Sequence, residues 1–146
     1  MLNEATKQFI KAHRFDDVRK LALQSPNPSV LQSLNPSILY FKYALTQIEG
    51  RQYAENKIPS WYQFDEIVYP PHLSLEQCSS EQTARYKAGL LSGNSFVDLT
   101  GGFGVDFAFI SSKFRESYYV EKQKELKEIA DILSSVIYCV IKQLEF

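Results

Sequence analysis

The chain has 146 residues and a mass of 16.8 kDa, which is enough for one ordinary domain built around one main core. Apolar residues make up 45% of it and charged residues 23%, a balance that excludes a disordered tail, a collagen-like fibre and a disulfide-stapled miniprotein. The net charge of -1 creates no overall field that would attract phosphate backbones or anionic lipid, so any contact with nucleic acid must be local.

The cysteines and the apolar stretches bear on location. Cys78 and Cys139 lie in unlike sequence contexts, and we expect both to be reduced thiols of a cytoplasmic protein. The start of the chain carries an early acid, Glu4, and lacks the basic segment and apolar run of a secretory signal. The longest apolar-leaning stretch, residues 136–141, is far shorter than the roughly 20 residues needed to span a bilayer. We therefore expect no membrane role.

Residues 1–78 are expected to form a helical N-terminal region that ends in an aromatic linker. Apolar residues recur at spacings of three and four in the first part of the chain and predict two short helices. A third helix is predicted to begin at Asn35, a good N-cap that is followed by Pro36 at the first helical position, and to bend at Gly50. Residues 57–78 read as an irregular, aromatic-rich connection.

Residues 79–146 are expected to form a partial α/β domain. Ser79 is followed three residues later by Gln82, a spacing that predicts a capping box and a helix that runs to about Leu91. Beyond a turn at 92–94 the pattern predicts, in order, a strand at 96–99, a helix at 106–112, a strand at 117–120 that ends on Glu121, and a helix from about 123 toward 133. This β-α-β-α order is typical of parallel strands joined by right-handed crossovers, and it predicts the opening, incomplete part of a Rossmann-like sheet.

A glycine cluster follows the first predicted strand. Gly101, Gly102 and Gly104 remove the Cβ atoms that would keep another group away from the backbone, so a ligand is expected in this turn. Glu121 closes the next strand, where a carboxylate can accept hydrogen bonds from two ribose hydroxyls. The glycine turn and the acid together indicate a cofactor that contains a nucleoside.

Details of the turn favour one cofactor. A dinucleotide fingerprint would need a third glycine where the chain has the bulky Phe107, which argues against NAD and FAD. Asp98 lies at the tip of the first predicted strand and suits a ligand with a positive ammonium group, such as the methionine half of S-adenosyl-L-methionine. The sulfonium of that cofactor also favours a nearby carboxylate.

Residues 98–104 resemble motif I of class I S-adenosylmethionine-dependent methyltransferases, and residues 118–121 resemble the acidic motif on the second strand of that family. Within it, the sequence is similar to bacterial methyltransferases with an N-terminal helical region and a C-terminal THUMP-like or ferredoxin-like domain, related in their motifs to RNA guanine-N2 methyltransferases. Segments 47–52, 57–61 and 73–81 add to a likeness that covers about residues 1–130.

The resemblance implies a set of cofactor-binding residues and a partner. The set consists of Asp98, Thr100, Gly101, Gly102, Gly104 and Glu121. Thr100 departs from the family, since it stands where many members have the first glycine of the motif. RNA is the partner that the resemblance implies, as the substrate of an RNA-directed methyltransferase.

One family motif is not found. The fourth strand of such enzymes normally ends in an Asp/Asn-Pro-Pro-aromatic motif that holds the target amine, and no such motif follows the glycine turn. Tyr69-Pro70-Pro71-His72 lacks the leading Asp or Asn and precedes the turn, so a rigid linker is the preferred interpretation. No catalytic residue is therefore named, and we expect a truncated N-terminal fragment that is inactive alone.

Plain structural roles compete with several of these assignments. The glycine turn is also compatible with a strand-to-helix turn that holds no ligand. Asp106 is expected to cap the following helix rather than to order the loop, and Gln82 and Thr83 fit a helix N-terminus almost as well as the methionine end of a cofactor.

The same two kinds of role are open to several basic and aromatic residues. Arg51, Lys57 and Trp61 could grip unpaired bases, but a core tryptophan with solvated basic neighbours is favoured. His13 is interpreted as a packed imidazole, and His72 has no plausible partner for a metal site.

The sequence is also compatible with two other functions. The first is a non-enzymatic helical interaction module with a vestigial nucleotide-binding fold, which associates with itself or with a partner through an open sheet edge. The second, less favoured, is a fragment of a nucleotide-binding oxidoreductase that would prefer NAD.

Overall fold

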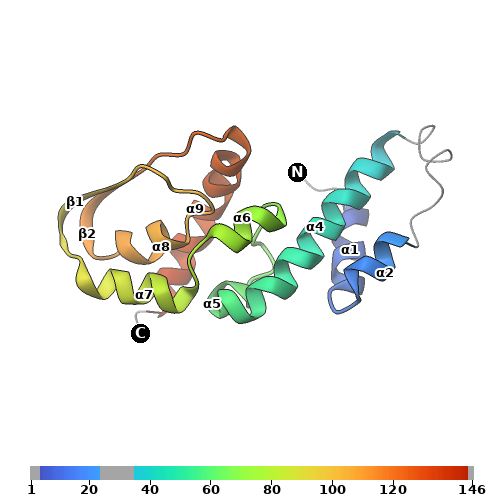
Figure 1. The fold of residues 1–146 in the computed structure, drawn as a ribbon, viewed down its shortest axis with the longest axis horizontal. Helices are drawn as coiled ribbons and strands as arrows, with labels where there is room; N and C mark the ends of the chain where they lie inside the picture. The colour runs from blue at the N-terminus through green and yellow to red at the C-terminus, as the bar shows by residue number, and fades with distance from the viewer. Residues whose placement is uncertain (1–3, 24–34, 145–146) are drawn as a thin grey trace.

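A computed structural model describes residues 4–23 and 35–144. The N-terminal part is helical, as expected: α1 (Glu4–His13) and α2 (Val18–Leu23) pack against the long helix α4 (Asn35–Lys57). Figure 1 shows α4 running from this pair of helices toward the rest of the molecule. Within the described residues, no helix combines the length and the apolar character needed to cross a membrane.

Helix α4 passes through Gly50 without a break, so the bend expected there was wrong. The glycine serves a close contact instead, because a Cβ at this position would overlap the Cβ of Tyr69. Gln47, one turn earlier, holds the same segment: its Nε2 donates to the carbonyl of Tyr69 at 2.9 Å, and its Oε1 accepts the Tyr69 N–H at 2.8 Å. The segment that contains Tyr69 is thereby fixed along α4.

The connection at 57–78 is more regular than expected. It holds two short helices, α5 (Pro59–Tyr62) and α6 (His72–Gln77), each beginning next to a proline. Arg51 donates to the carbonyls of Tyr62 and Phe64, and Lys57 donates to two carbonyls at the end of α6. Arg51 and Lys57 therefore hold residues 57–78 against α4 through these hydrogen bonds. This corrects the expectation that the two basic side chains are only solvated.

The C-terminal part contains α7 (Glu81–Leu90), β1 (Gly93–Asp98), α8 (Val105–Ser111), β2 (Phe114–Tyr119) and α9 (Lys124–Leu144). The strands begin three residues earlier than predicted, so Gly93 belongs to β1 and not to a turn, and α9 continues far beyond 133. Ser80 rather than Ser79 caps α7, because its hydroxyl accepts the N–H of Thr83.

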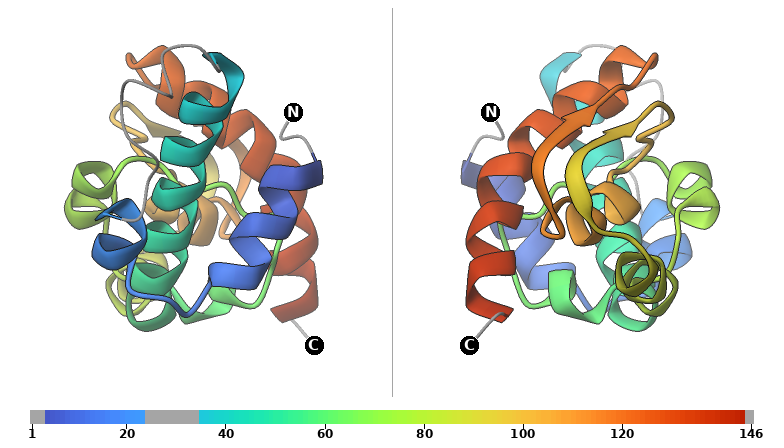
Figure 2. Two further views of the ribbon diagram at one scale, coloured as in Figure 1. Left: turned by 90° about the vertical axis from the view of Figure 1, so that its right-hand side faces the viewer. Right: turned by 90° about the vertical axis from the view of Figure 1, so that its left-hand side faces the viewer.

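β1 and β2 pair in parallel, with Val97 opposite Tyr118 and Asp98 opposite Tyr119, which confirms the predicted mixed α/β character and parallel pairing. Helix α8 connects them and packs on one face, where Phe96 stacks on Phe107 and Phe114. The right-hand view in Figure 2 looks at the two strands from the other side, with α8 behind them.

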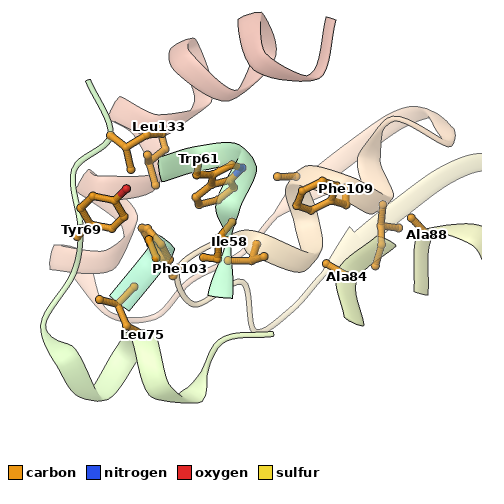
Figure 3. Close-up of a cluster of buried hydrophobic side chains, with 14 residues drawn as sticks. Ile58, Trp61, Tyr69, Leu75, Ala84, Ala88, Phe103, Phe109 and Leu133 are labelled. Atoms are coloured by element: carbon orange, nitrogen blue, oxygen red, sulfur yellow. The ribbon is translucent and has the colours of Figure 1, made fainter. Parts of the chain in front are cut away.

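The main core lies where the helical part meets the α/β part. Trp61, 1% exposed, packs edge-on against Phe103 from the glycine turn, with ring centroids 5.2 Å apart. Figure 3 shows these rings between Leu133 of α9 and Leu75 of α6. The preference for Trp61 as a core residue is confirmed, and residues from both sides of position 78 build this core.

Candidate cofactor-binding site

The turn after β1 is held by backbone hydrogen bonds that continue the sheet. The Val120 N–H donates to the Asp98 carbonyl at 2.9 Å, and the Gly101 N–H donates to the Val120 carbonyl at 3.0 Å. The Asp98 carboxylate accepts the N–H of Thr100 at 3.0 Å, which folds the chain back at the strand end. The ends of both strands are thus fixed relative to each other.

Two of the glycines have a backbone conformation that other residues rarely adopt. Gly102 has a φ of 56° and Gly104 a φ of 85°, both in the left-handed region. Gly104 is also the N-cap of α8, and its carbonyl accepts the N–H of Ala108. Asp106 therefore does not cap α8, contrary to expectation, because it already lies inside the helix.

Gly101 makes room for the second strand. A Cβ on Gly101 would overlap the ring of Tyr119, whose hydroxyl donates to the Gly102 carbonyl at 2.6 Å. Burial, followed by the negative charges of Glu121 and Asp98, raises the pKa of Tyr119 to about 12, so the phenol stays protonated and remains a donor at neutral pH. The group that lies close to the Gly101 backbone is therefore the Tyr119 side chain and not a ligand.

Glu121 reaches back from the end of β2 to the same turn. Its Oε1 accepts the N–H of Gln123 at 2.7 Å, and its Oε2 accepts the N–H of Gly102 at 2.8 Å. The first of these bonds, assisted by the second, holds the pKa of Glu121 below its ordinary value despite some burial. Glu121 is thus an ionised acceptor whose remaining lone pairs are available to hydroxyl donors.

The glycine turn and both strand-end acids border one cavity of about 560 Å³, within the usual range of roughly 300–1,000 Å³ for ligand pockets. All six residues predicted from sequence line it. Its other lining residues include Ser74, Gln77, Cys78, Ser79, Lys87, Asp106, Lys122, Gln123 and Leu126. Gln82 and Thr83, the weaker sequence candidates, do not line it.

The cavity wall also carries a charged cluster that sequence reasoning missed. Lys87 Nζ lies 2.7 Å from Asp106 Oδ2 and 3.0 Å from Ser79 Oγ, and Ser79 Oγ also donates to Asp106 Oδ2 at 2.8 Å. Lys87 is three residues from the buried Ala84, a spacing that places both on neighbouring positions of the helix surface. That spacing was the available signal, but it does not say which helix packs against α7.

Other reactive side chains have ordinary roles. Cys78 is a free thiol that donates to the Leu75 carbonyl, and burial raises its pKa, so it is a poor nucleophile. The side chain of Cys139 lies outside the described residues. His13 packs on Phe9 and pairs with Asp16. In residues 4–23 and 35–144, no group of three or more His, Cys, Asp or Glu could hold a metal ion.

Neither a protein-family model nor a curated protein matches the chain. Among solved structures, it is similar to a "putative methyltransferase" from Porphyromonas gingivalis W83, with a TM-score of 0.71 and 30% sequence identity. The match covers 91% of this chain and 31% of that one, so the chain spans about a third of the length of the solved protein. At this coarse level, the similarity supports the methyltransferase resemblance seen in the motifs.

Proposed function

We propose that the chain is the cofactor-binding part of a class I S-adenosylmethionine-dependent methyltransferase with a Rossmann-like sheet. One observation carries the proposal: the glycine turn, Asp98 and Glu121 border a single cavity of about 560 Å³. Similarity to the longer solved protein adds support at the level of the reaction class. Asp98, Thr100, Gly101, Gly102, Gly104 and Glu121 form the proposed binding set.

The residues present fit such a cofactor. Glu121 is an acceptor with lone pairs left for ribose hydroxyls, and Asp98 adds a second negative charge that favours a cationic ligand. When bound, the cofactor supplies an activated methyl group on a sulfonium. The turn holds and orients it, so the contribution of this chain to catalysis is proximity.

The methyl acceptor is proposed to be RNA, and the support is the motif resemblance. Lys7 and Lys11 of α1 and Arg14 just beyond it line a second cavity of about 720 Å³, but Asp65 and Glu66 line it too, so this cavity is not a purely basic surface. Methyl transfer is proposed to require further residues, including a target-amine motif and a THUMP-like domain, supplied by a longer protein. A cytoplasmic location is part of the proposal.

Calorimetric titration with S-adenosylhomocysteine tests cofactor binding. We expect saturable binding to the wild-type chain and about 10-fold or weaker affinity in Glu121→Gln, because a neutral amide replaces a charged acceptor. Glu116→Gln is the matched control, since Glu116 lies on β2 but outside the cavity. A flat titration of folded wild-type protein, or equal loss in both variants, would contradict the proposal.

A second function is favoured by a separate observation. Val97, Leu99, Tyr118 and Val120 are 46% exposed or more, although all four are large hydrophobic residues at the strands or their ends. This uncovered surface supports the interaction module considered from sequence, in which the sheet associates with a further polypeptide or with a second copy of the chain. Leu99 also lines the cofactor cavity, so this surface borders the cavity at that residue.

A further inference from the structure

We propose that Lys87 anchors the carboxylate of the methionine half of the cofactor. The inference rests on the proposed function and adds to it a recognition residue for the amino-acid end of the ligand. Glu121 and Lys87 line the same cavity, with the glycine turn also in its wall. Glu121 bonds to Gly102 and Gln123, whereas Lys87 bonds to Ser79 and Asp106, so the two charges belong to different parts of the cavity wall. If Glu121 holds the ribose, the part of the wall that contains Lys87 is left for the amino-acid end of the ligand.

The Lys87 ammonium has the geometry of an anion anchor. Asp106 and Ser79 accept two of its three N–H groups, at 2.7 and 3.0 Å, which fixes its position in the cavity wall. Its side chain is 42% exposed and lines the cavity, and the third N–H group is left for a ligand. Asp106 is then a positioning residue, because its Oδ2 holds both Lys87 and the Ser79 hydroxyl.

The charges along the cavity complete the argument. Asp98, Asp106 and Glu121 are negative, and the cavity wall also contains two cations, Lys87 and Lys122. Lys122 follows Glu121 directly and belongs to the proposed ribose end. Lys87 is therefore the cation that we assign to the carboxylate, while Asp98 favours the neighbouring ammonium and sulfonium.

A purely structural role makes a different prediction. Lys87 joins α7 to α8 through its contact with Asp106, so its loss would weaken the packing of these helices in any case. Such weakening would lower the affinity for every ligand of the cavity. An anchor for the carboxylate affects only ligands that carry one.

Three ligands separate these roles in calorimetric titrations of the full chain. S-adenosylhomocysteine carries the carboxylate, its decarboxylated analogue keeps only the ammonium, and 5′-methylthioadenosine lacks both. We expect the wild-type chain to bind S-adenosylhomocysteine about 10-fold or more tightly than the decarboxylated analogue. Lys87→Met should bind these two equally and should bind 5′-methylthioadenosine like the wild type.

Two further variants serve as controls. Lys122→Met removes the other cation of the same cavity, next to Glu121 in the sequence, and should preserve the preference for the carboxylate. Lys87→Arg should restore part of that preference, because a guanidinium also binds carboxylates. Equal losses for all three ligands in Lys87→Met, or a carboxylate preference that survives in it, would overturn the inference.

The wild-type measurement keeps the test decisive even if Lys87→Met does not fold. Equal wild-type affinity for S-adenosylhomocysteine and its decarboxylated analogue overturns the Lys87 assignment and leaves the proposed function intact. A folded wild-type chain that binds none of the three ligands overturns the proposed function, and the Lys87 assignment with it. The two failures are therefore distinguishable.

Discussion

The ring of Tyr119 determines which residue types fit at position 101. The tyrosine ring occupies the place where a Cβ would lie, and its hydroxyl bond to the Gly102 carbonyl keeps the ring from moving away. We expect Gly101→Ala to lower the free energy of unfolding by about 1–3 kcal/mol, the usual cost of overpacking. Urea unfolding followed by circular dichroism measures this change.

Gly89→Ala is the matched control for this prediction. Gly89 is exposed in α7, and a Cβ there would meet no atom within 4 Å. The same substitution should therefore stabilise the chain by about 0.5–1 kcal/mol through helix propensity. Equal effects of the two substitutions would show that Tyr119 does not constrain Gly101.

At the residue scale, the candidate site divides into a part that sequence could predict and a part that it could not. Asp98 and Glu121 each end a strand, and parallel strands end at the same edge of a sheet, so their proximity follows from local patterns. Lys87 and Ser79 reach the cavity only because α7 packs against α8. That packing is a long-range property with no local signature.

Helices α5 and α7 are joined by one buried carboxylate. Glu81, whose side chain is 11% exposed, accepts the Ser60 N–H through Oε2 at 2.8 Å and the Arg85 guanidinium through Oε1. Burial alone would raise the pKa of Glu81, but the bonds from Ser60 and Arg85 outweigh it and lower the pKa below the ordinary value near 4.5. The folded state therefore favours the ionised carboxylate.

The lowered pKa makes this contribution dependent on pH. The stabilisation is fully present above pH 4.5 and is lost as the pH falls through the lower pKa of the folded state. Glu81→Gln should reduce the free energy of unfolding by about 1.5–3 kcal/mol at pH 7 and by less below pH 4. Urea unfolding of both proteins across this pH range measures the difference.

Glu76→Gln controls for general effects of charge. Glu76 is 52% exposed and lies 3.6 Å from the ring of His72, so its removal should change stability by less than about 1 kcal/mol at either pH. A Glu81→Gln difference that stays constant with pH would show that the Glu81 carboxylate is not selectively stabilised in its ionised form.

At the element scale, sequence patterns predicted the order of helices and strands better than their ends. The sequence predicts a bend at Gly50 and an irregular connection over residues 57–78, since glycine and proline usually interrupt helices. In the structure, Gly50 leaves room for the side chain of Tyr69 inside a continuous helix, and Pro59 is the first residue of α5. Neither residue interrupts the packed structure. Distinguishing a break from a close contact needs the partner element, which local sequence does not identify.

The whole molecule presents a small sheet with one apolar face uncovered. Val97 is 50% exposed and its cross-strand partner Tyr118 58%, while the opposite face of the sheet packs on α8. Both strands have their outer edges unpaired within the described residues. Parallel sheets are usually covered on both faces. The uncovered face is therefore a surface on which another polypeptide segment or a second copy of the chain could pack.

Self-association through this surface should therefore increase with protein concentration. Replacing the cross-strand pair by opposite charges, Val97→Lys with Tyr118→Glu, keeps a favourable pairing between the strands but makes the face polar. Sedimentation velocity should show a rising average mass for the wild type and a constant monomer for the double variant.

Leu73→Lys, at an exposed apolar position on α6, should behave like the wild type. A wild-type chain that stays monomeric at all concentrations would exclude a second copy as the partner of this face, whereas association that persists in the double variant would locate the contact on another surface.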